Sequence, residues 1–274
     1  MFKIIIMALL IFIGMVGYDN ITDKAQPTTP VQQEQQKVSK HEKSAAMALF
    51  TSLLPPKEEW PSPVHKFYLA FNMDEVIDPI RQNPNWTGLD AMSRDIPQAL
   101  IAIEDHAFYN HGAIAVEGIL RAALANINAG EVVQGGSTLT QQFVKNVFLS
   151  HEQSMERKIE EAVLSLMLED NYSKDEILEL YLNTTYFGAG STGIKQASRT
   201  YFGKAPSALT LAEAAVIASL PYAPTSLNPL ENPEGCKKRQ LLVLAAMHKY
   251  GMINQGQLAE AKAEKIRLTN GTVM

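Results

Sequence analysis

A segment from Gly135 to Asn146, GGSTLTQQFVKN, has residue types that hold an anion at the start of a helix. Its paired glycines let the backbone approach a ligand closely, and Thr138 followed three positions later by Gln141 has capping-box spacing. The free N–H groups and positive dipole end of such a helix favour phosphate or pyrophosphate near Ser137. Lys145, about one turn further on, adds a positive charge. A tight turn before an ordinary core helix is the alternative.

A pair of carboxylates precedes this segment and could take part in acid–base chemistry. Glu104 falls at the margin of an apolar helix face, whereas Asp105 projects away from it. The face comprises Ile96, Ala99, Leu100 and Ile103. Partial desolvation at such a margin raises proton affinity and suits a general base, although a carboxylate that caps the next turn has the same position. Phe108 and His111 follow, and His111 taken alone is interpreted as a hydrogen-bonded structural histidine.

A second charged group lies in the sequence RKIEE at residues 157–161. Arg157 and Glu161 are four positions apart, so they share a helix face and can form an ion pair. Residues 162–168 are apolar on nearly every side, which indicates an internal helix whose charged entrance lines a cavity. The periodicity does not choose between Glu160 and Glu161, and a solvated ion-pair face is the alternative.

Helices are expected to position these groups, because most segments after Pro63 have a helical period. The clearest are residues 96–105, 119–127, 138–148, 153–169, 174–183, 209–220 and 237–250. With neither an alternating strand series nor an internal repeat, the predicted fold class is mainly α. The 274 residues, 46% of them hydrophobic, can bury one sizeable core in one or two lobes.

The charge and the cysteine content exclude some kinds of partner. A net charge of −5 without a dense basic stripe argues against nucleic acid. Cys236 is the only cysteine, so intrachain disulfides and cysteine zinc clusters are excluded.

Residues 1–18 are predicted to be an N-terminal membrane anchor. The apolar run from Ile4 to Val16 is shorter than the roughly 17–25 residues of a spanning helix, so a cleaved signal segment or a buried helix are alternatives. Lys3 favours an N-terminus in the cytoplasm and export of the rest. Residues 19–60 form a flexible polar and proline-rich linker, residues 61–260 the folded domain and residues 261–274 a C-terminal tail.

The order of motifs along the chain resembles the peptidoglycan glycosyltransferase (transglycosylase) domain of family 51, found in bifunctional penicillin-binding proteins and their monofunctional relatives. The motifs are Glu104-Asp105-x-x-Phe108-Tyr109-x-His111, Gly135-Gly-Ser-Thr-x-Thr-Gln-Gln-x-x-Lys-Asn146, Arg157-Lys-x-x-Glu161, Ile177-Leu-Glu-x-Tyr-Leu-Asn183 and Tyr186-Phe-Gly-x-Gly190. The resemblance continues through Tyr201-Phe-Gly203 and Leu220-Pro-x-Ala-Pro224 to Asn228-Pro229, and covers residues 65–255.

This resemblance implies a lysozyme-like, two-lobed, mainly helical domain with a membrane-facing jaw within residues 113–134. It also implies polymerisation of lipid II into β-1,4 glycan strands, with release of undecaprenyl pyrophosphate. The implied location is the outer, periplasmic side of the bacterial cytoplasmic membrane. The implied partners are lipid II, the growing glycan strand, the membrane and other cell-wall synthesis proteins.

The resemblance also implies roles for individual residues. Glu104 matches the general base that deprotonates the acceptor 4-hydroxyl, which attacks the donor with inversion. Glu161, rather than Glu160, matches the second catalytic carboxylate, near the leaving pyrophosphate. The expected substrate and pyrophosphate ligands are Ser137, Thr138, Gln141, Lys145, Asn146, Arg157 and Lys158. The expected cleft-shaping residues are Asp105, Phe108, His111, Gly135, Gly136 and Asn183. Mg²⁺ or another divalent cation could assist at the diphosphate, although no ligand spacing requires one.

The chain departs from the family pattern after His111. Where that pattern continues x-Gly-x-Asp, the chain has Ala113 and Ala115. Ala113 restricts the turn, and Ala115 removes a carboxylate that orients the next segment, yet activity is expected because the main catalytic positions remain. A transpeptidase domain is not expected, since no Ser-x-x-Lys with its partner motifs is present.

Other functions are also compatible with parts of the sequence. A lysozyme-like muramidase would use the same pair of carboxylates, but the pyrophosphate-binding segment and Arg157 argue against it, because a hydrolase has no anionic leaving group to hold. A non-catalytic scaffold that binds lipid II or cell-wall synthesis proteins is suggested by Ala113 and Ala115.

Overall fold

The computed structural model describes residues 68–69, 72–120, 135–149 and 154–274, and the statements below concern those residues. They are helical, and their only β-structure is a pair of isolated bridges, Tyr186 with Thr192 and Arg267 with Val273. The contacts divide the chain into residues 1–69 and Ala70–Met274, and every element below belongs to the second unit. The predicted mainly α class is confirmed for the described residues.

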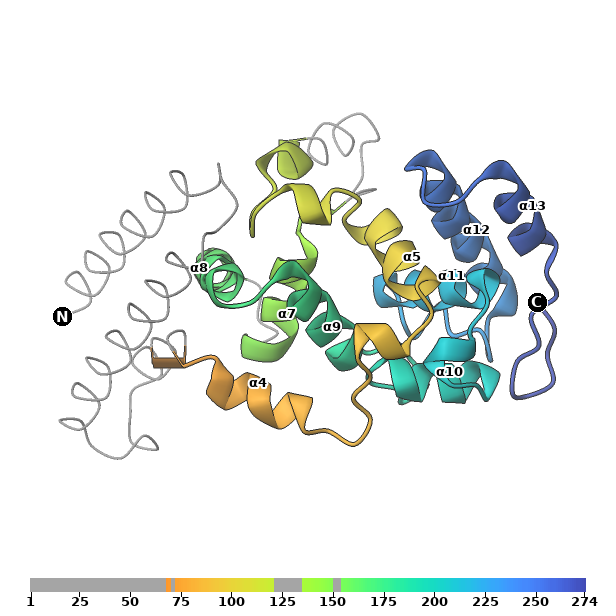
Figure 1. The fold of residues 1–274 in the computed structure, drawn as a ribbon, viewed down its shortest axis with the longest axis horizontal. Helices are drawn as coiled ribbons and strands as arrows, with labels where there is room; N and C mark the ends of the chain where they lie inside the picture. The colour runs from red at the N-terminus through yellow and green to blue at the C-terminus, as the bar shows by residue number, and fades with distance from the viewer. Residues whose placement is uncertain (1–67, 70–71, 121–134, 150–153) are drawn as a thin grey trace. The chain divides into compact units, whose positions relative to one another are not determined.

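The helices of this unit are shown in Figure 1. In chain order they are α4 (Asp74–Arg81), α5 (Asp95–Glu104), α7 (Leu139–Phe148), α8 (Met155–Asn171), α9 (Lys174–Thr184), α10 (Ile194–Phe202), α11 (Leu211–Ser219), α12 (Pro233–Lys249) and α13 (Gln255–Ala263). Except for 119–127, which lies mostly outside the described residues, each predicted helical segment overlaps one of them, with its ends shifted by a few residues.

Several helices begin at a capping box. In each, the side chain of the residue before the helix accepts from the backbone N–H three positions later, and the side chain at that later position accepts from the first backbone N–H. The pairs are Thr138 with Gln141, Ser173 with Glu176, Thr210 with Glu213 and Asn254 with Gln257. Because these bonds satisfy N–H groups that a helix leaves open, the sequence itself sets where α7, α9, α11 and α13 start.

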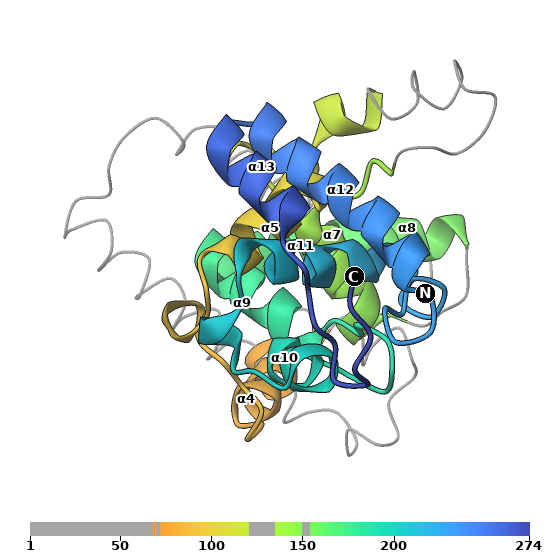
Figure 2. The same ribbon diagram turned by 90° about the vertical axis from the view of Figure 1, so that its right-hand side faces the viewer.

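The helices pack in two groups. α11 is buried along its whole length and packs against α5 and α12, which also contact each other (Figures 1 and 2). Its small side chains let these neighbours approach closely. The small residues are Ala212, Ala214, Ala215 and Ala218, and Val216 and Ile217 are buried beside them. The second group consists of α7, α8 and α9, and α10 contacts both groups through α9 and α11.

Three helices, α4, α10 and α13, were not among the clearest periodic segments. α4 contains Pro79, which lacks the N–H that a helix interior uses. α10 is short and lies between Gly193 and Gly203, both at positive φ. The last residues, predicted as a tail, contact α10: the Thr269 N–H donates to the Tyr201 carbonyl oxygen at 3.0 Å.

The membrane-related predictions fall mostly outside the described residues. These are the anchor at 1–18, the linker at 19–60 and most of the jaw at 113–134. Residues 116–120, at the start of the jaw segment, are helical and expose Val116, Ile119 and Leu120. A search of the described helices finds none with the length and apolar character needed to cross a membrane.

Candidate active site

Glu104 lies at the last position of α5, where it is held by a side chain from α7. Gln142 Nε2 donates to Glu104 Oε2 at 3.0 Å, and the buried Tyr181 hydroxyl donates to Gln142 Oε1 at 3.0 Å. Burial raises the pKa of Glu104, while the Gln142 hydrogen bond and the charges of Arg239 and Lys145 oppose that rise. The expectation of a raised proton affinity at Glu104 is therefore confirmed, and the carboxylate is oriented as well as desolvated.

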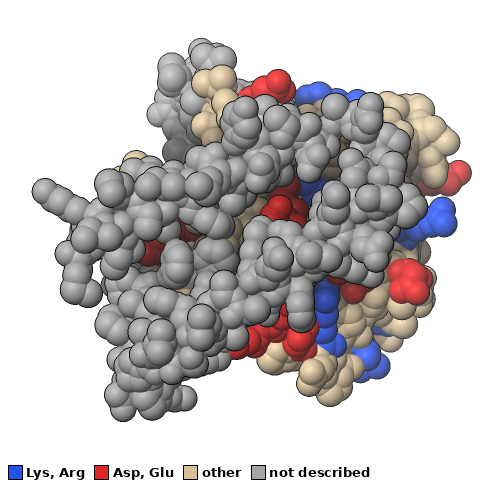
Figure 3. Space-filling view, turned by 60° about the vertical axis from the view of Figure 1, so that its left-hand side comes forward, with Lys and Arg blue, Asp and Glu red and all other residues tan. Residues whose placement is uncertain are grey.

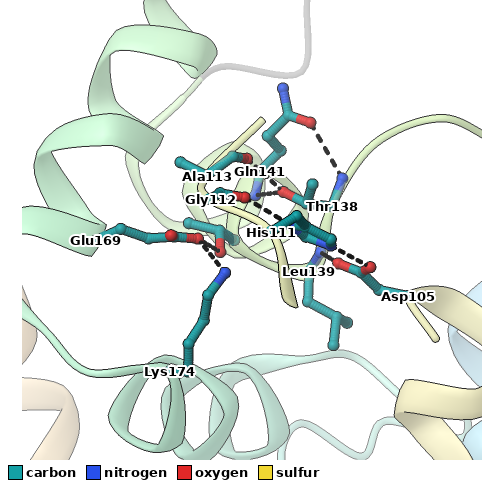
Figure 4. A network of polar contacts seen from close by, with 10 residues as sticks. Asp105, His111, Gly112, Ala113, Thr138, Leu139, Gln141, Glu169 and Lys174 are labelled. Atoms are coloured by element: carbon teal, nitrogen blue, oxygen red, sulfur yellow. Dashed lines mark hydrogen bonds and ion pairs between the residues drawn. The ribbon is translucent and has the colours of Figure 1, made fainter. Parts of the chain in front are cut away.

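Asp105, predicted to project away from the apolar face of α5, is held by polar partners and is not open to solvent. α5 ends at Glu104, so Asp105 leaves the helical path, and its side chain is only 8% exposed. One carboxylate oxygen contacts His111 Nε2 at 2.6 Å, and the other accepts from the Leu139 N–H at 3.1 Å (Figure 4). Asp105 therefore connects the end of α5 to the start of α7.

His111 is held between two hydrogen-bond acceptors. Its Nδ1 lies 2.6 Å from the Gly112 carbonyl oxygen, and its Nε2 faces Asp105. A ring between two acceptors donates from both nitrogens only when it is protonated. The Asp105 hydrogen bond accordingly raises the pKa of His111, although burial opposes the change. The prediction of a hydrogen-bonded structural histidine is confirmed.

The start of α7 has the predicted capping box. The Thr138 hydroxyl accepts from the Gln141 N–H at 3.1 Å and also donates to the buried Ala113 carbonyl oxygen at 2.8 Å (Figure 4). Gln141 Oε1 accepts from the Thr138 N–H at 3.1 Å. Together with the Leu139–Asp105 bond, these contacts give protein partners to the N–H groups that were expected to face an anion. The prediction of free N–H groups is therefore wrong at Thr138, Leu139 and Gln141.

The side chain of Gln141 has a structural contact of its own. It is 3% exposed and its Oε1 closes the capping box, while its role toward a substrate stays a prediction. The neighbouring Gln142 contacts Glu104 instead. Both glutamines were visible in the sequence, but only the packing of α7 against its neighbours decides which of them reaches the carboxylate.

A cationic cluster next to the α7 start is built from the first turns of α8. Arg157 Nη1 donates to Glu161 Oε2 at 3.2 Å, and Lys158 Nζ pairs with the other Glu161 oxygen. Lys158 Nζ also donates to Ser137 Oγ at 3.1 Å. The Glu161 side chain is 2% exposed, so the predicted Arg157–Glu161 pair is confirmed, and it is not a solvated surface pair. Two cations around one carboxylate leave this cluster with a net positive charge.

The other predicted residues have separate positions. Lys145 and Asn146 are exposed on α7, and the charge of Lys145 acts on Glu104. Asn183 bonds with the Thr87 N–H and carbonyl oxygen, each at 2.9 Å, so it connects α9 to an adjacent loop. Phe108 is fully buried under the ammonium of Lys174. A Cβ built on Gly135 would meet no atom within 4 Å, and Gly136 is half-buried before Ser137.

The later motifs have a structural role in the described residues. Gly188 has φ +86°, and a Cβ there would lie 2.3 Å from the Pro224 carbonyl oxygen. The buried Tyr201 hydroxyl donates to the Phe187 carbonyl oxygen at 2.7 Å. These contacts join the segments around residues 187, 201 and 224, which lie far apart in the sequence, and only glycine fits at the closest approach.

Arg239 on α12 is the site residue that the sequence analysis missed. Its charge acts on Glu104, and its guanidinium carbon lies 4.1 Å from the centre of the Tyr222 ring. Nothing in the local sequence marks it, because it follows Glu104 by more than a hundred residues and is brought there by packing of α12 on α5.

The described residues do not include a metal site. They contain no group of three or more His, Cys, Asp or Glu side chains able to hold an ion. On the coloured surface in Figure 3, acidic and basic side chains lie next to one another and do not form a uniformly basic face. The charged groups of the site in the described residues are those around Glu104 and Glu161.

Comparison with known proteins gives one consistent match. A family model described as transglycosylase matches residues 73–248. A provisionally named transglycosylase of Cupriavidus necator is 41% identical over 194 residues, which are 71% of this chain and 84% of that protein. Penicillin-binding protein 1A of Neisseria flavescens is 44% identical over 68% of this chain and 23% of its own length. That of Aquifex aeolicus is 44% identical over 64% and 24%.

The match covers only one part of the penicillin-binding proteins, since this chain spans about a quarter of their length. A crystal structure of penicillin-binding protein 1A from Haemophilus influenzae matches 48% of this chain and 16% of that one at 33% identity, with a TM-score of 0.34. That score is too low to transfer details of the fold.

Proposed function

The chain belongs to the transglycosylase family, and from this premise we propose that it polymerises lipid II into β-1,4 glycan strands and releases undecaprenyl pyrophosphate. The observation that carries the proposal is that α7 connects a desolvated carboxylate with a cationic cluster. Gln142 on α7 holds Glu104, and Ser137, just before α7, accepts from Lys158 of the cluster that also contains Arg157 and Glu161. A base and a separate anion-binding cluster are what a transfer with a diphosphate leaving group needs.

Glu104 acts as the general base of this reaction. Its carboxylate takes the proton of the acceptor 4-hydroxyl while that oxygen bonds to the anomeric carbon of the donor. The acceptor oxygen attacks from the face opposite the diphosphate, so the configuration at that carbon inverts. The bond from the carbon to the diphosphate oxygen breaks, and its electron pair leaves with the diphosphate. The Gln142 hydrogen bond fixes the carboxylate, and burial strengthens it as a base.

The cluster on α8 holds the leaving diphosphate. Glu161 orients Arg157 and Lys158, and Lys158 extends to Ser137 at the start of α7. The cations stabilise negative charge that grows on the diphosphate as the bond breaks. In this scheme Glu161 acts through the cations it positions. A divalent cation such as Mg²⁺ at the diphosphate would add to this charge stabilisation.

The substrate and product determine where the protein works. Lipid II carries a long lipid, so the reaction takes place at the surface of the cytoplasmic membrane, on its outer side. The apolar run at residues 4–16 is the proposed attachment to that membrane. The growing glycan strand and other cell-wall synthesis proteins are the further proposed partners.

Labelled lipid II tests the proposal. The full chain in mild detergent is incubated with it, and the products are separated by length. We expect polymer from the wild type and a loss of about 10²–10⁴-fold in rate for Glu104→Gln, the usual range for a general base. Glu260→Gln is the matched control, because Glu260 is exposed on α13 and the chemical change is identical.

Two outcomes would replace the proposal by another function. Cleavage of preformed glycan without polymer formation would indicate a muramidase. Tight binding of lipid II without turnover, and equally in Glu104→Gln, would indicate a scaffold, the possibility raised by Ala113 and Ala115.

A further inference from the structure

Arg239 is a half-buried arginine without a polar partner in the described part of the chain. It makes no hydrogen bond or ion pair there, and its Nε is shielded from solvent with nothing to donate to. A guanidinium carries five N–H donors, and leaving them unpaired in a partly buried position costs free energy. Such an arrangement is stable at a functional site where a ligand supplies the missing acceptors.

The guanidinium is fixed in place by an aromatic ring. It lies over Tyr222, in the short 3-10 turn η5 (Leu220–Tyr222) that follows α11, with 4.1 Å between the guanidinium carbon and the ring centre. Tyr222 is 64% exposed, so its ring is open to a ligand outside the contact with Arg239. Stacking limits the motion of the arginine, so less entropy is lost when it binds.

Arg239 and the diphosphate cluster lie on helices with different neighbours. The positive charge of Arg239 acts on Glu104. α8, which carries Arg157 and Lys158, and α12 lie on opposite sides of α5 and α7 in Figure 1. α12 packs on α5, which carries Glu104, whereas α8 packs on α7 and α9. The diphosphate ligands and Arg239 therefore come from helices that contact different parts of the site.

We propose that Arg239 and Tyr222 bind the acceptor saccharide beside Glu104. The guanidinium donates to hydroxyl or N-acetyl oxygens of the acceptor sugar, and the Tyr222 ring contacts its apolar face. This combination orients the 4-hydroxyl toward the base. A saccharide fits because it offers oxygen acceptors together with a flat C–H face, whereas the diphosphate is already matched by the cations on α8. The inference rests on the proposed transfer reaction.

An acceptor that cannot serve as a donor tests this directly. The methyl glycoside of the N-acetylglucosamine–N-acetylmuramic acid disaccharide has the attacking 4-hydroxyl but no leaving group. With labelled lipid II held constant as donor, we expect Arg239→Gln to raise the KM for this disaccharide at least about tenfold, the usual effect of losing a charged hydrogen bond. The KM for lipid II as donor should change much less. Lys238→Gln, exposed on the same helix, is the matched control.

Further variants separate binding from a general structural effect. Arg239→Lys keeps the charge near Glu104 but loses the planar fork, so the acceptor KM should rise while the acidic limb of the pH profile stays in place. Arg239→Gln should also move that limb to higher pH, because the charge lowers the pKa of Glu104. Tyr222→Ala should raise the acceptor KM without moving the limb.

Binding of the unlabelled disaccharide, followed by NMR, separates this inference from the proposed function. One outcome is a wild type that binds the disaccharide but makes no polymer, together with an Arg239→Gln variant that does not bind it. That outcome would refute the proposed reaction and support the saccharide site. A wild type that polymerises lipid II but neither binds nor uses the disaccharide would overturn the inference alone. An acceptor KM in Arg239→Gln equal to that of the wild type would do the same.

Discussion

Replacing Thr138 by Ala should destabilise the protein more than removing any ordinary helix cap. The Thr138 hydroxyl accepts from the Gln141 N–H and donates to the Ala113 carbonyl oxygen, and both contacts are buried. Loss of an N-cap costs about 1 kcal/mol. Leaving a buried carbonyl without its donor costs about 1–3 kcal/mol more. Since such terms do not add fully, we expect a loss of about 2 kcal/mol in the free energy of unfolding.

Ser173 provides the matched comparison. It begins α9 with the same capping box, but its hydrogen bonds are exposed and none of them reaches another segment. Ser173→Ala should therefore cost about 1 kcal/mol, the cap alone. Thr138→Ser keeps the hydroxyl and should retain most of the stability. The Tm should fall by roughly 4–8 °C for Thr138→Ala and by roughly 2–4 °C for Ser173→Ala in a unit of this size.

Urea unfolding followed by far-UV circular dichroism, in the detergent used for the activity assay, measures these differences. The lipid II assay on the same samples reports whether Ser137, next to the cap, is still placed correctly. Equal losses for Thr138→Ala and Ser173→Ala would refute the reasoning, because the contact with Ala113 would then contribute nothing. A Thr138→Ser variant as unstable as Thr138→Ala would refute it as well.

Further predictions concern pH and the departures from the family pattern. Because burial raises the pKa of Glu104, the acidic limb of the kcat/KM profile should lie above pH 4.5, the ordinary pKa of a glutamate. Lys145→Gln should move this limb to higher pH, because the charge of Lys145 lowers that pKa. A limb that stays in place would contradict the role of the Lys145 charge. The pKa of His111 is raised in the folded state. Its contribution to the free energy of unfolding is therefore complete below about pH 6.5 and is lost as the pH rises through the folded-state pKa. Urea midpoints measured from pH 6 to 9 should therefore fall more steeply in the wild type than in His111→Gln, and parallel curves would exclude this linkage. The Ala115 carbonyl oxygen accepts from the Ile119 N–H at the start of a helical turn, and alanine offers no side-chain cap. Ala115→Asp should therefore raise the free energy of unfolding by about 0.5–2 kcal/mol, seen as a higher urea midpoint, and an unchanged midpoint would show that no cap forms.

Local patterns in the sequence correctly predicted features that depend on a single helix. The Thr138–Gln141 capping box and the Arg157–Glu161 pair were both expected from spacings of three and four residues. In a helix these spacings place side chains on neighbouring turns, whatever the rest of the protein does. The same holds for the mainly α class, which follows from the period of the apolar residues.

Contacts between segments could not be predicted in this way. The position of Asp105 off the apolar face did not predict its contacts with His111 and the start of α7, because those contacts depend on how separate segments pack. Gln142, and not Gln141, donates a hydrogen bond to Glu104. The Gln141 side chain lies at the start of α7, where its Oε1 accepts from the Thr138 N–H.

Arg239 marks the limit most clearly. The sequence alone predicted most of the helices, the capping box of α7 and the order of the charged motifs, because each depends on residues within about one helical turn. Only the tertiary structure brought α12 against α5 and so placed Arg239 and Tyr222 near Glu104. Side chains more than a hundred positions apart have no fixed spacing along the chain, and their meeting is decided by how the helices pack around the buried α11.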